Sequence, residues 1–165
     1  MKTVYLIRHA KSDWGNEHLR DIDRPLNQRG YSDAYLQSKL FAKEHQHPEL
    51  LVTSPAVRAY STCAIFAREI NYNENKIQIV LDLYEASTAT IISTLATINN
   101  KINSVALFGH NPGFTNVFDE ISDAYVDEIP TCGIVGVKFR MHDWSEVYTT
   151  KGESFLSFFP KNFKQ

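Results

Sequence analysis

The chain has 165 residues, enough for one substantial core, and we expect a single domain over residues 1–165. Its content of 43% hydrophobic and 22% charged residues is typical of globular proteins and excludes a disordered chain. Because 17 Lys and Arg residues nearly balance 19 Asp and Glu residues, the composition argues against a nucleic-acid-binding protein, which is usually basic.

The sequence carries no signal for secretion, membrane insertion or disulfide bonding. No apolar run reaches the length of a membrane span, and Arg8 and His9 interrupt the N-terminal apolar run that a signal peptide would need. Cys63 and Cys132 lie far apart and match no metal-ligand spacing. We therefore expect a cytoplasmic protein without a membrane partner. We also expect a monomer, because no apolar stripe demands a second subunit.

The N-terminal part of the chain predicts a strand, a loop and a helix. Residues 4–7 form an apolar run that predicts a buried strand over residues 2–7. A polar loop follows over residues 11–26, and Asn27 can cap a helix that runs to about His45. The apolar side chains at helical spacing are Tyr31, Ala34, Tyr35, Phe41 and Ala42, with Leu36 and Leu40 to one side.

The middle of the chain continues the alternation of strands and helices. Residues 50–53 predict a short buried strand. Ser54-Pro55 predicts a helix start, with Ser54 as N-cap and Pro55 at the first helical position, and this helix runs to about Ile70. The next predicted elements are a third strand at residues 76–81, a loop at 82–87 and a third helix at 88–99.

The last part of the chain predicts one more strand and helix, then a pair of strands. Residues 104–108 form the fourth strand, and Asn111 and Pro112 are expected as N-cap and first position of a helix that ends near Ser122. Strands at residues 133–139 and 154–158 flank a short turn at 141–146, which suggests an antiparallel pair. The alternation implies an α/β fold, a three-layer α/β/α sandwich with a mostly parallel central sheet.

Charged or titratable side chains follow all four of the first strands. Arg8 and His9 end the first strand, and Arg58 lies one turn into the helix after the second. Glu85 is in the loop after the third strand, and His110 follows the fourth. Because parallel strands place their carboxyl ends at one edge of the sheet, where ligands bind in such folds, we expect these side chains to converge on one site.

This set of side chains suits a phosphoryl group. Arg8 and Arg58 would bind its oxygens through charge-assisted hydrogen bonds, and two helix N-termini would add free N–H groups. A neutral imidazole can attack phosphorus directly, and the nearby arginines disfavour a protonated His9. His110 would donate a hydrogen bond to the charge that develops on the phosphoryl oxygens. The residues therefore predict phosphoryl transfer through His9.

Three further residues leave alternatives open. Glu85 is a candidate general acid for the leaving group, or a structural carboxylate in an exposed loop. Arg24 is a candidate substrate-binding residue, with a structural role at the entry to the first helix as the alternative. Trp14 either lines the site or packs its loop, and we favour packing of the loop.

The sequence resembles the histidine phosphatase superfamily, whose founders are the phosphoglycerate mutases, along essentially its whole length. The stretch Leu-Ile-Arg-His-Ala-Lys-Ser-Asp-Trp at residues 6–14 and Asp-Arg-Pro-Leu at 23–26 resemble its SixA-like phosphohistidine phosphatase branch. Further matches are Thr-Ser-Pro-Ala-Val-Arg-Ala-Tyr-Ser-Thr at 53–62, Leu-Tyr-Glu-Ala at 83–86, Gly-His-Asn-Pro-Gly at 109–113, Pro-Thr-Cys-Gly at 130–133 and Trp144.

The resemblance implies a phosphoglycerate mutase-like fold and a covalent phosphohistidine on His9. It places Arg8, Arg58 and His110 in the phosphate pocket and implies neither a metal nor a cofactor. Ala10 replaces a glycine common in the mutases, and the longer insertions that cover the mutase site are absent, so the resemblance suggests an open site and hydrolysis. The expected partner is a phosphorylated substrate, and a phosphohistidine protein is one candidate. A phosphatase of phosphosugars or nucleotides and a catalytically silent phospho-binding module remain as alternatives.

Overall fold

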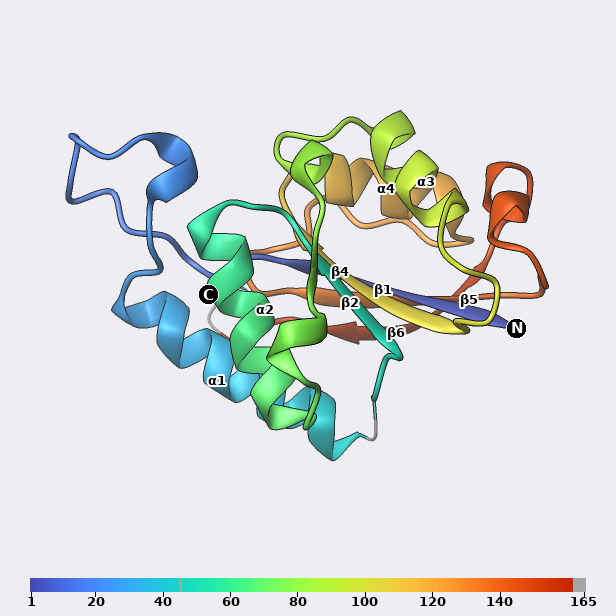
Figure 1. Ribbon diagram of the computed structural model, residues 1–165, viewed down its shortest axis with the longest axis horizontal. Helices are drawn as coiled ribbons and strands as arrows, with labels where there is room; N and C mark the ends of the chain where they lie inside the picture. Colours follow the sequence, from blue (N-terminus) through green and yellow to red (C-terminus); the bar gives the residue numbers. More distant parts are fainter. Residues whose placement is uncertain (45, 162–165) are drawn as a thin grey trace.

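The computed structural model describes residues 1–44 and 46–161 and has a six-stranded sheet at its centre (Figure 1). The strand order is β3-β2-β4-β1-β5-β6. The first four strands run parallel, while β5 runs antiparallel to both β1 and β6, which confirms the predicted mostly parallel sheet and the late antiparallel pair. The strands are β1 (Lys2–Arg8), β2 (Leu50–Thr53), β3 (Gln78–Ile79), β4 (Ser104–Gly109), β5 (Ile134–Phe139) and β6 (Glu153–Phe158).

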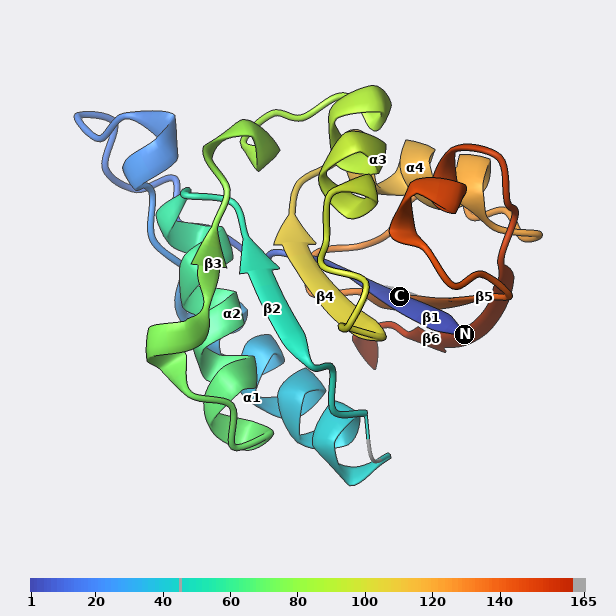
Figure 2. The ribbon, with the colours of Figure 1, turned by 45° about the vertical axis from the view of Figure 1, so that its right-hand side comes forward.

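Two helices cover each face of the sheet, which confirms the three-layer architecture (Figure 2). One face carries α1 (Gln28–Lys43) and α2 (Val57–Glu69), and the other carries α3 (Thr88–Ala96) and α4 (Gly113–Ile121). Successive side chains of a strand point to opposite faces. In β1, Val4 and Leu6 therefore join the core beneath α3 and α4, and Tyr5 and Ile7 join the core beneath α1 and α2. Burial on both faces explains why the strand is apolar throughout.

The central strand β1 is fixed on both sides at the end that carries the predicted site. The backbone N–H of His9 donates to the carbonyl of Gly109 at 3.0 Å, on the β4 side. On the β5 side, the N–H of Cys132 lies 3.0 Å from the carbonyl oxygens of both Arg8 and His9. Cys132 has a φ of 61°, a left-handed conformation that turns the chain back toward β1. The last residues of β1 are therefore held in register by both neighbouring strands.

Two predicted helix starts are corrected by the structure. The helix after β2 begins at Val57 with Ala56 as N-cap, and Ser54 accepts a hydrogen bond from the N–H of Ala56 at 3.1 Å before the helix begins. The helix after β4 begins at Gly113 with Pro112 as N-cap. The Asn111 side chain still accepts from the N–H of Thr115 at 3.2 Å, so it supports the first turn from outside the helix.

The third strand is shorter than predicted, and the following helix also ends earlier. Only Gln78 and Ile79 pair with β2, and both are exposed, because β3 lies at the edge of the sheet. A short 3-10 helix, η2 (Glu74–Lys76), precedes it, and another, η3 (Leu81–Leu83), begins two residues after it. The helix predicted over residues 88–99 is α3, which ends at Ala96.

The first helix buries Ala34 and Phe41 as predicted, but its buried face is rotated away from the two predicted tyrosines. Asn27 caps it as predicted, since the Asn27 side chain accepts from the N–H of Gly30 at 2.7 Å. Tyr31 and Tyr35 are 43% and 44% exposed, and Leu36 is 65% exposed. The helix instead buries mostly small and polar side chains: Gly30, Asp33, Ala34, Gln37, Ser38 and Phe41. It ends at Lys43, and the predicted end at His45 lies outside the described residues.

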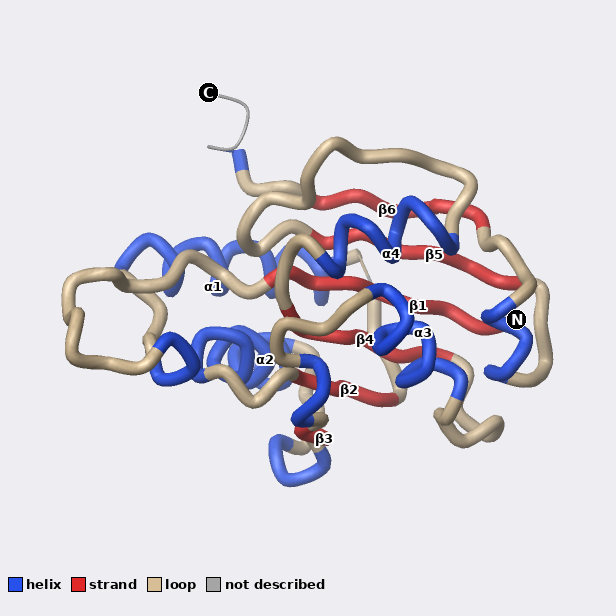
Figure 3. Tube along the Cα trace, turned by 90° about the horizontal axis from the view of Figure 1, so that it is seen from above, coloured by secondary structure: helices blue, strands red, loops and turns tan. Residues whose placement is uncertain are grey.

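The loop of residues 11–26 extends beyond the end of the sheet (Figure 3). It contains a short 3-10 helix, η1 (Asp21–Asp23), and contacts the N-terminal part of α2. The residues the structure describes include no helix long and apolar enough to cross a membrane.

Candidate active site

A cleft of about 730 Å³ opens at the carboxyl ends of the parallel strands. It brings together every residue that the sequence analysis assigned to the site. These residues line the cleft: Arg8, His9, Arg24, Arg58, Glu85 and His110. The loop of residues 11–26 adds Lys11, Ser12 and Trp14, and the remaining lining comes from Ala86, Ser87, Asn111, Pro112 and Thr131.

His9 is buried and held in one orientation. Its Nδ1 lies 2.7 Å from the carbonyl oxygen of Ala10. A carbonyl oxygen only accepts hydrogen bonds, so Nδ1 carries the ring hydrogen and Nε2 keeps its lone pair. Burial lowers the pKa of His9 to about 3, and the charges of His110, Arg58 and Arg8 act in the same direction. His9 is therefore a neutral imidazole at neutral pH, with a free lone pair on Nε2.

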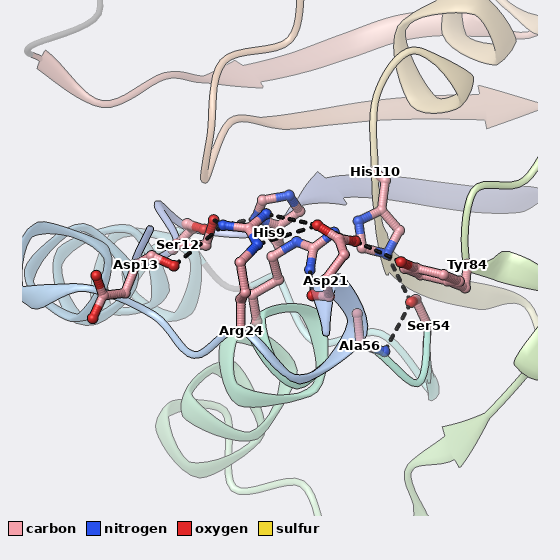
Figure 4. Close-up of polar contacts among 11 residues, drawn as sticks. His9, Ser12, Asp13, Asp21, Arg24, Ser54, Ala56, Tyr84 and His110 are labelled. Atoms are coloured by element: carbon pink, nitrogen blue, oxygen red, sulfur yellow. Dashed lines mark hydrogen bonds and ion pairs between the residues drawn. The ribbon is translucent and has the colours of Figure 1, made fainter. Parts of the chain in front are cut away.

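His110 faces His9 across the cleft. The two ring centres are 5.1 Å apart, and Nε2 of His110 lies 2.7 Å from the hydroxyl oxygen of Ser54 (Figure 4). Burial lowers the pKa of His110 to about 4, with a further contribution from the positive charge of Arg58. Ser54, predicted as a helix cap, thus contacts His110 directly. This pair could not be predicted from the sequence, because only the fold brings β2 and β4 side by side.

Arg8 is held by the loop that precedes β5. Its Nη1 donates to the carbonyl of Ile129 at 2.9 Å and to the carboxylate of Glu128 at 3.3 Å. The Nε of Arg8 is buried and has no hydrogen-bond acceptor among the described residues. Arg8 is therefore anchored through one terminal nitrogen, while the edge formed by Nε and Nη2 is left for another acceptor.

Arg58 is held by Asp21, which lies in η1. Its Nη1 donates to the backbone carbonyl of Asp21 at 2.7 Å, and its Nη2 donates to the Asp21 carboxylate at 3.0 Å. The Nε of Arg58 is buried and, within the described chain, lacks an acceptor. The side of the guanidinium that carries Nε is thus the side left for a ligand, as in Arg8.

Asp21 is a residue that the sequence analysis missed, and it joins three parts of the site (Figure 4). Besides Arg58, its carboxylate accepts from the Tyr84 hydroxyl at 2.5 Å and from Nε and Nη2 of Arg24 at 3.1 and 3.0 Å. The Tyr84 bond is the main cause of an Asp21 pKa well below its usual range, with Arg58 and Arg24 acting in the same direction. The Tyr84 ring packs edge-on against His110, with ring centres 5.6 Å apart.

Arg24 lines the cleft, but its donors are largely used within the protein. It is 7% exposed. In addition to Asp21, it donates to the hydroxyl of Ser12 at 2.7 Å and to the carbonyl of Asp13 at 3.3 Å. These contacts support the structural alternative for Arg24, since they tie the two ends of the loop of residues 11–26 together.

Glu85 belongs to the lining of the cleft. It is exposed and has a φ of 55°, a left-handed conformation that is uncommon for residues other than glycine. This conformation places the residue at the turn between η3 and α3. No group of three or more His, Cys, Asp or Glu side chains within residues 1–44 and 46–161 is arranged to hold a metal ion.

Comparison with known proteins identifies the family. Residues 4–99 match the family model of the histidine phosphatase superfamily (branch 1). An uncharacterized chloroplastic protein of Arabidopsis thaliana is 26% identical over 161 residues, which cover 92% of this chain and 72% of that protein. An uncharacterized protein of Mycobacterium tuberculosis is 29% identical over 153 residues, which cover 86% of this chain and 91% of that protein.

Solved structures agree with this match. A protein from Agrobacterium tumefaciens, assigned as the phosphohistidine phosphatase SixA, has a TM-score of 0.81 and 26% identity, with 96% of this chain and 98% of that chain covered. The protein histidine phosphatase SixA complexed with tungstate has a TM-score of 0.82 over 98% and 99% of the two chains, and at 19% identity this likeness concerns the fold. The chain thus belongs to the histidine phosphatase superfamily, resembles its SixA-like branch and is a phosphatase.

Proposed function

We propose that this phosphatase works through a covalent phosphohistidine on His9. The observation that carries the proposal is the hydrogen bond from Nδ1 of His9 to the Ala10 carbonyl, which leaves the Nε2 lone pair as nucleophile. A histidine with a pKa of about 3 needs no base to activate it at neutral pH. In the first step, a bond forms between Nε2 and phosphorus, and the bond from phosphorus to the leaving group breaks.

Arg8 and Arg58 bind the phosphoryl oxygens in this proposal. In each guanidinium, terminal nitrogens donate hydrogen bonds to acceptors of the protein. The Nε atom of each is buried and has no acceptor among the described residues. A buried donor without an acceptor is unfavourable, and a phosphoryl oxygen in the cleft would supply that acceptor. Two charge-assisted contacts of this kind suit the dianion of a phosphate monoester or a phosphoramidate.

His110 stabilises the charge that develops during transfer. The Ser54 hydroxyl can donate its hydrogen to Nε2 of His110, which leaves the hydrogen of the neutral ring on Nδ1. That N–H is a fixed donor on the His9 side of the cleft, and removal of one such donor typically costs 10²–10³-fold in turnover. In the second step, water attacks phosphorus, the bond to Nε2 of His9 breaks, and inorganic phosphate leaves.

In this proposal, Glu85 is the general acid that protonates poor leaving groups. Its place on the cleft wall supports this role, because a proton donor must reach the atom that departs from phosphorus. Protonation by a positioned side chain typically contributes 10²–10⁴-fold. An alcohol leaving group would need this assistance more than an imidazole or an activated phenol.

The substrate class that we propose is a phosphohistidine side chain on a protein. The likeness to a protein assigned as a phosphohistidine phosphatase, over 96% of this chain, supports this class. The open cleft also supports it, since its volume of about 730 Å³ leaves room for more than a phosphoryl group. An imidazole leaving group would in addition make little demand on Glu85.

The first experiment is hydrolysis of an aryl phosphate by chelator-treated protein, with His9→Ala measured in parallel. We expect turnover in the chelator-treated wild type and its loss in His9→Ala, because the variant lacks the nucleophile. Trapping of labelled phosphate on the wild-type protein, but not on His9→Ala, would identify the intermediate. Substantial turnover in His9→Ala would contradict the mechanism. Loss of wild-type turnover on chelation would point to metal-dependent chemistry.

The substrate class needs a second comparison. Release of phosphate from a phosphohistidine protein is measured beside a panel of phosphosugars and nucleotides. We expect a much higher kcat/KM for the phosphohistidine protein. A higher kcat/KM for one of the small metabolites would replace this substrate class while leaving the mechanism in place.

A further inference from the structure

Trp14 is an exposed aromatic side chain on the wall of the cleft. It belongs to the lining of the cleft together with His9, and it is 75% exposed. Aromatic side chains that line a cleft commonly contact the ligand that binds there. The mechanism proposed above makes no use of Trp14.

One face of the Trp14 ring is supported by a buried cation. The guanidinium carbon of Arg24 lies 3.4 Å from the centre of the ring, in a stacked cation–π contact. Arg24 cannot easily move, because its nitrogens donate to Asp21, Ser12 and the carbonyl of Asp13. The ring therefore rests on a fixed base, although most of its own surface is exposed.

The backbone of the loop is held as well. Ser12 and Leu26 form an antiparallel bridge, and the N–H of Asn27 donates to the carbonyl of Lys11 at 3.0 Å. Gly30 of α1 packs closely against the same carbonyl, since a Cβ at Gly30 would lie 2.1 Å from it. Because the loop and the ring are fixed before a ligand arrives, little conformational entropy would be lost when a ligand stacks on the ring.

We propose that Trp14 is a platform for the leaving group and makes the site select phosphoryl groups attached to a planar aromatic ring. The proposal rests on the proposed function, since it assumes that the phosphoryl group binds at His9. The phosphoryl end of the cleft is cationic and polar, with Arg8, Arg58 and His110. The Trp14 end offers an aromatic face, which suits the imidazole of a phosphohistidine or a phenol, because planar aromatic rings stack on one another.

The test uses two phosphonates that cannot be hydrolysed, phenylphosphonate and methylphosphonate, as competitive inhibitors of aryl phosphate hydrolysis. Both carry the same anionic group, and they differ in the ring. We expect Trp14→Ala to raise the inhibition constant of phenylphosphonate about tenfold and to leave that of methylphosphonate within about twofold, because only the ring loses its stacking partner. Trp14→Phe should restore most of the selectivity.

Tyr125→Ala is the matched control, since Tyr125 is also 75% exposed and lies outside the cleft lining. It should change neither inhibition constant. An equal rise of both constants in Trp14→Ala would mean that the ring only supports the loop, and unchanged constants would mean that no ring stacks there. Either result overturns the platform but leaves the phosphatase mechanism intact. Failure of the wild type to bind methylphosphonate would overturn both proposals.

A second experiment tests whether Trp14 contacts the imidazole of the substrate or the surface of the protein that carries it. It compares free phosphohistidine and a phosphohistidine protein as substrates. Stacking on the imidazole predicts a similar fall in kcat/KM for both substrates in Trp14→Ala. A fall confined to the protein substrate would mean that Trp14 contacts the surface of the carrier protein, and this result would contradict the platform.

Discussion

At the scale of single residues, burial and one hydrogen bond determine the protonation state and the tautomer of His9. Burial disfavours the charged ring, and the Ala10 carbonyl selects the tautomer with hydrogen on Nδ1. Both effects are set by the backbone at the end of β1 and by the side chains around the cleft. The sequence predicted an effect of the arginines on the pKa, but the largest cause is burial, which depends on the fold.

The ring of His9 should therefore stay neutral to unusually low pH. We expect a nitrogen NMR titration of the unliganded protein to give a midpoint near 3 for His9 and near 4 for His110. The sign follows from the lowered pKa values, since each ring binds a proton only when the pH falls to its own pKa. His9→Gln identifies the first signal. A His9 midpoint near the ordinary value of about 6.5 would contradict the buried neutral nucleophile.

Asp21 should act as a positioning residue for Arg58. Asp21→Asn keeps the shape of the side chain but removes the charge that orients Arg58 and accepts from Tyr84. We expect the KM for an aryl phosphate to rise about tenfold with a smaller change in kcat, because charge-assisted contacts are worth roughly 1.5–3 kcal/mol. The loss of a negative charge would by itself strengthen anion binding, but the carboxylate is partly exposed and its charge is screened.

Asp23→Asn is the control for this variant. Asp23 lies in the same short helix with similar side-chain exposure, and its carboxylate pairs with Arg20 on the surface. It should leave KM unchanged. A lower KM in Asp21→Asn would contradict this role. It would mean that the negative charge of Asp21 weakens substrate binding by repulsion more than its contacts with Arg58 strengthen it.

At the scale of elements, the sequence predicted where strands and helices occur better than where they begin. Apolar runs mark β1, β2 and β4 because these strands are buried on both faces. The edge strand β3 is exposed and short, so its apolar residues gave too long a prediction. Ser54 and Asn111 have the residue types of helix caps, but one contacts His110 and the other supports the loop at Ile129. Local pattern could not reveal these uses.

Part of the candidate site could be predicted, because several of its residues directly follow predicted strands. Arg8, His9, Arg58 and His110 follow strands directly, so the parallel sheet alone places them together. Asp21 lies in the middle of a polar loop, and nothing in its neighbourhood distinguishes it from Asp23. Its contacts with Arg58 and Tyr84 come from α2 and from the segment after η3, and only the tertiary structure brings those segments to the loop.

The contact between α1 and the loop of residues 11–26 gives a prediction at this scale. Gly30→Ala would place a Cβ 2.1 Å from the Lys11 carbonyl, where the backbone must shift. We expect the free energy of unfolding to fall by about 1–3 kcal/mol, as for other overpacked sites, and the selectivity for phenylphosphonate to weaken. Gly15→Ala is the control, since its Cβ would meet the carboxylate of Asp13 at 3.0 Å in an exposed part of the loop. Equal stability of the two variants, measured by urea unfolding, would contradict the close contact.

At the scale of the whole molecule, the two buried histidines make stability depend on pH. Their folded pKa values of about 3 and about 4 lie below the ordinary value of 6.5. Below pH 6.5 the unfolded chain therefore binds protons that the folded protein does not, and the free energy of unfolding falls as the pH falls. The fall is at most about 1.4 kcal/mol per pH unit for each histidine.

Urea unfolding at pH 7 and pH 5 measures this effect. We expect a lower free energy of unfolding at pH 5, and a smaller difference between the two pH values in His9→Gln. The carboxylate of Asp21 contributes little in this range, because its pKa lies well below its usual value and it stays charged. Equal stability of the wild type at the two pH values would show that the histidines are not desolvated in the folded state.

The hydrogen bonds that hold both sides of β1 have a consequence for how the protein responds to heat. His9 follows a central strand, pinned by Gly109 on one side and by Cys132 on the other, so its position can be lost only when the sheet itself opens. Trp14 lies on the loop of residues 11–26, outside the sheet, and the contacts that hold this loop can open without disturbing the strands. Warming should therefore make the enzyme less discriminating well before it becomes inactive, and amide exchange should be slow along β1 and fast around Trp14.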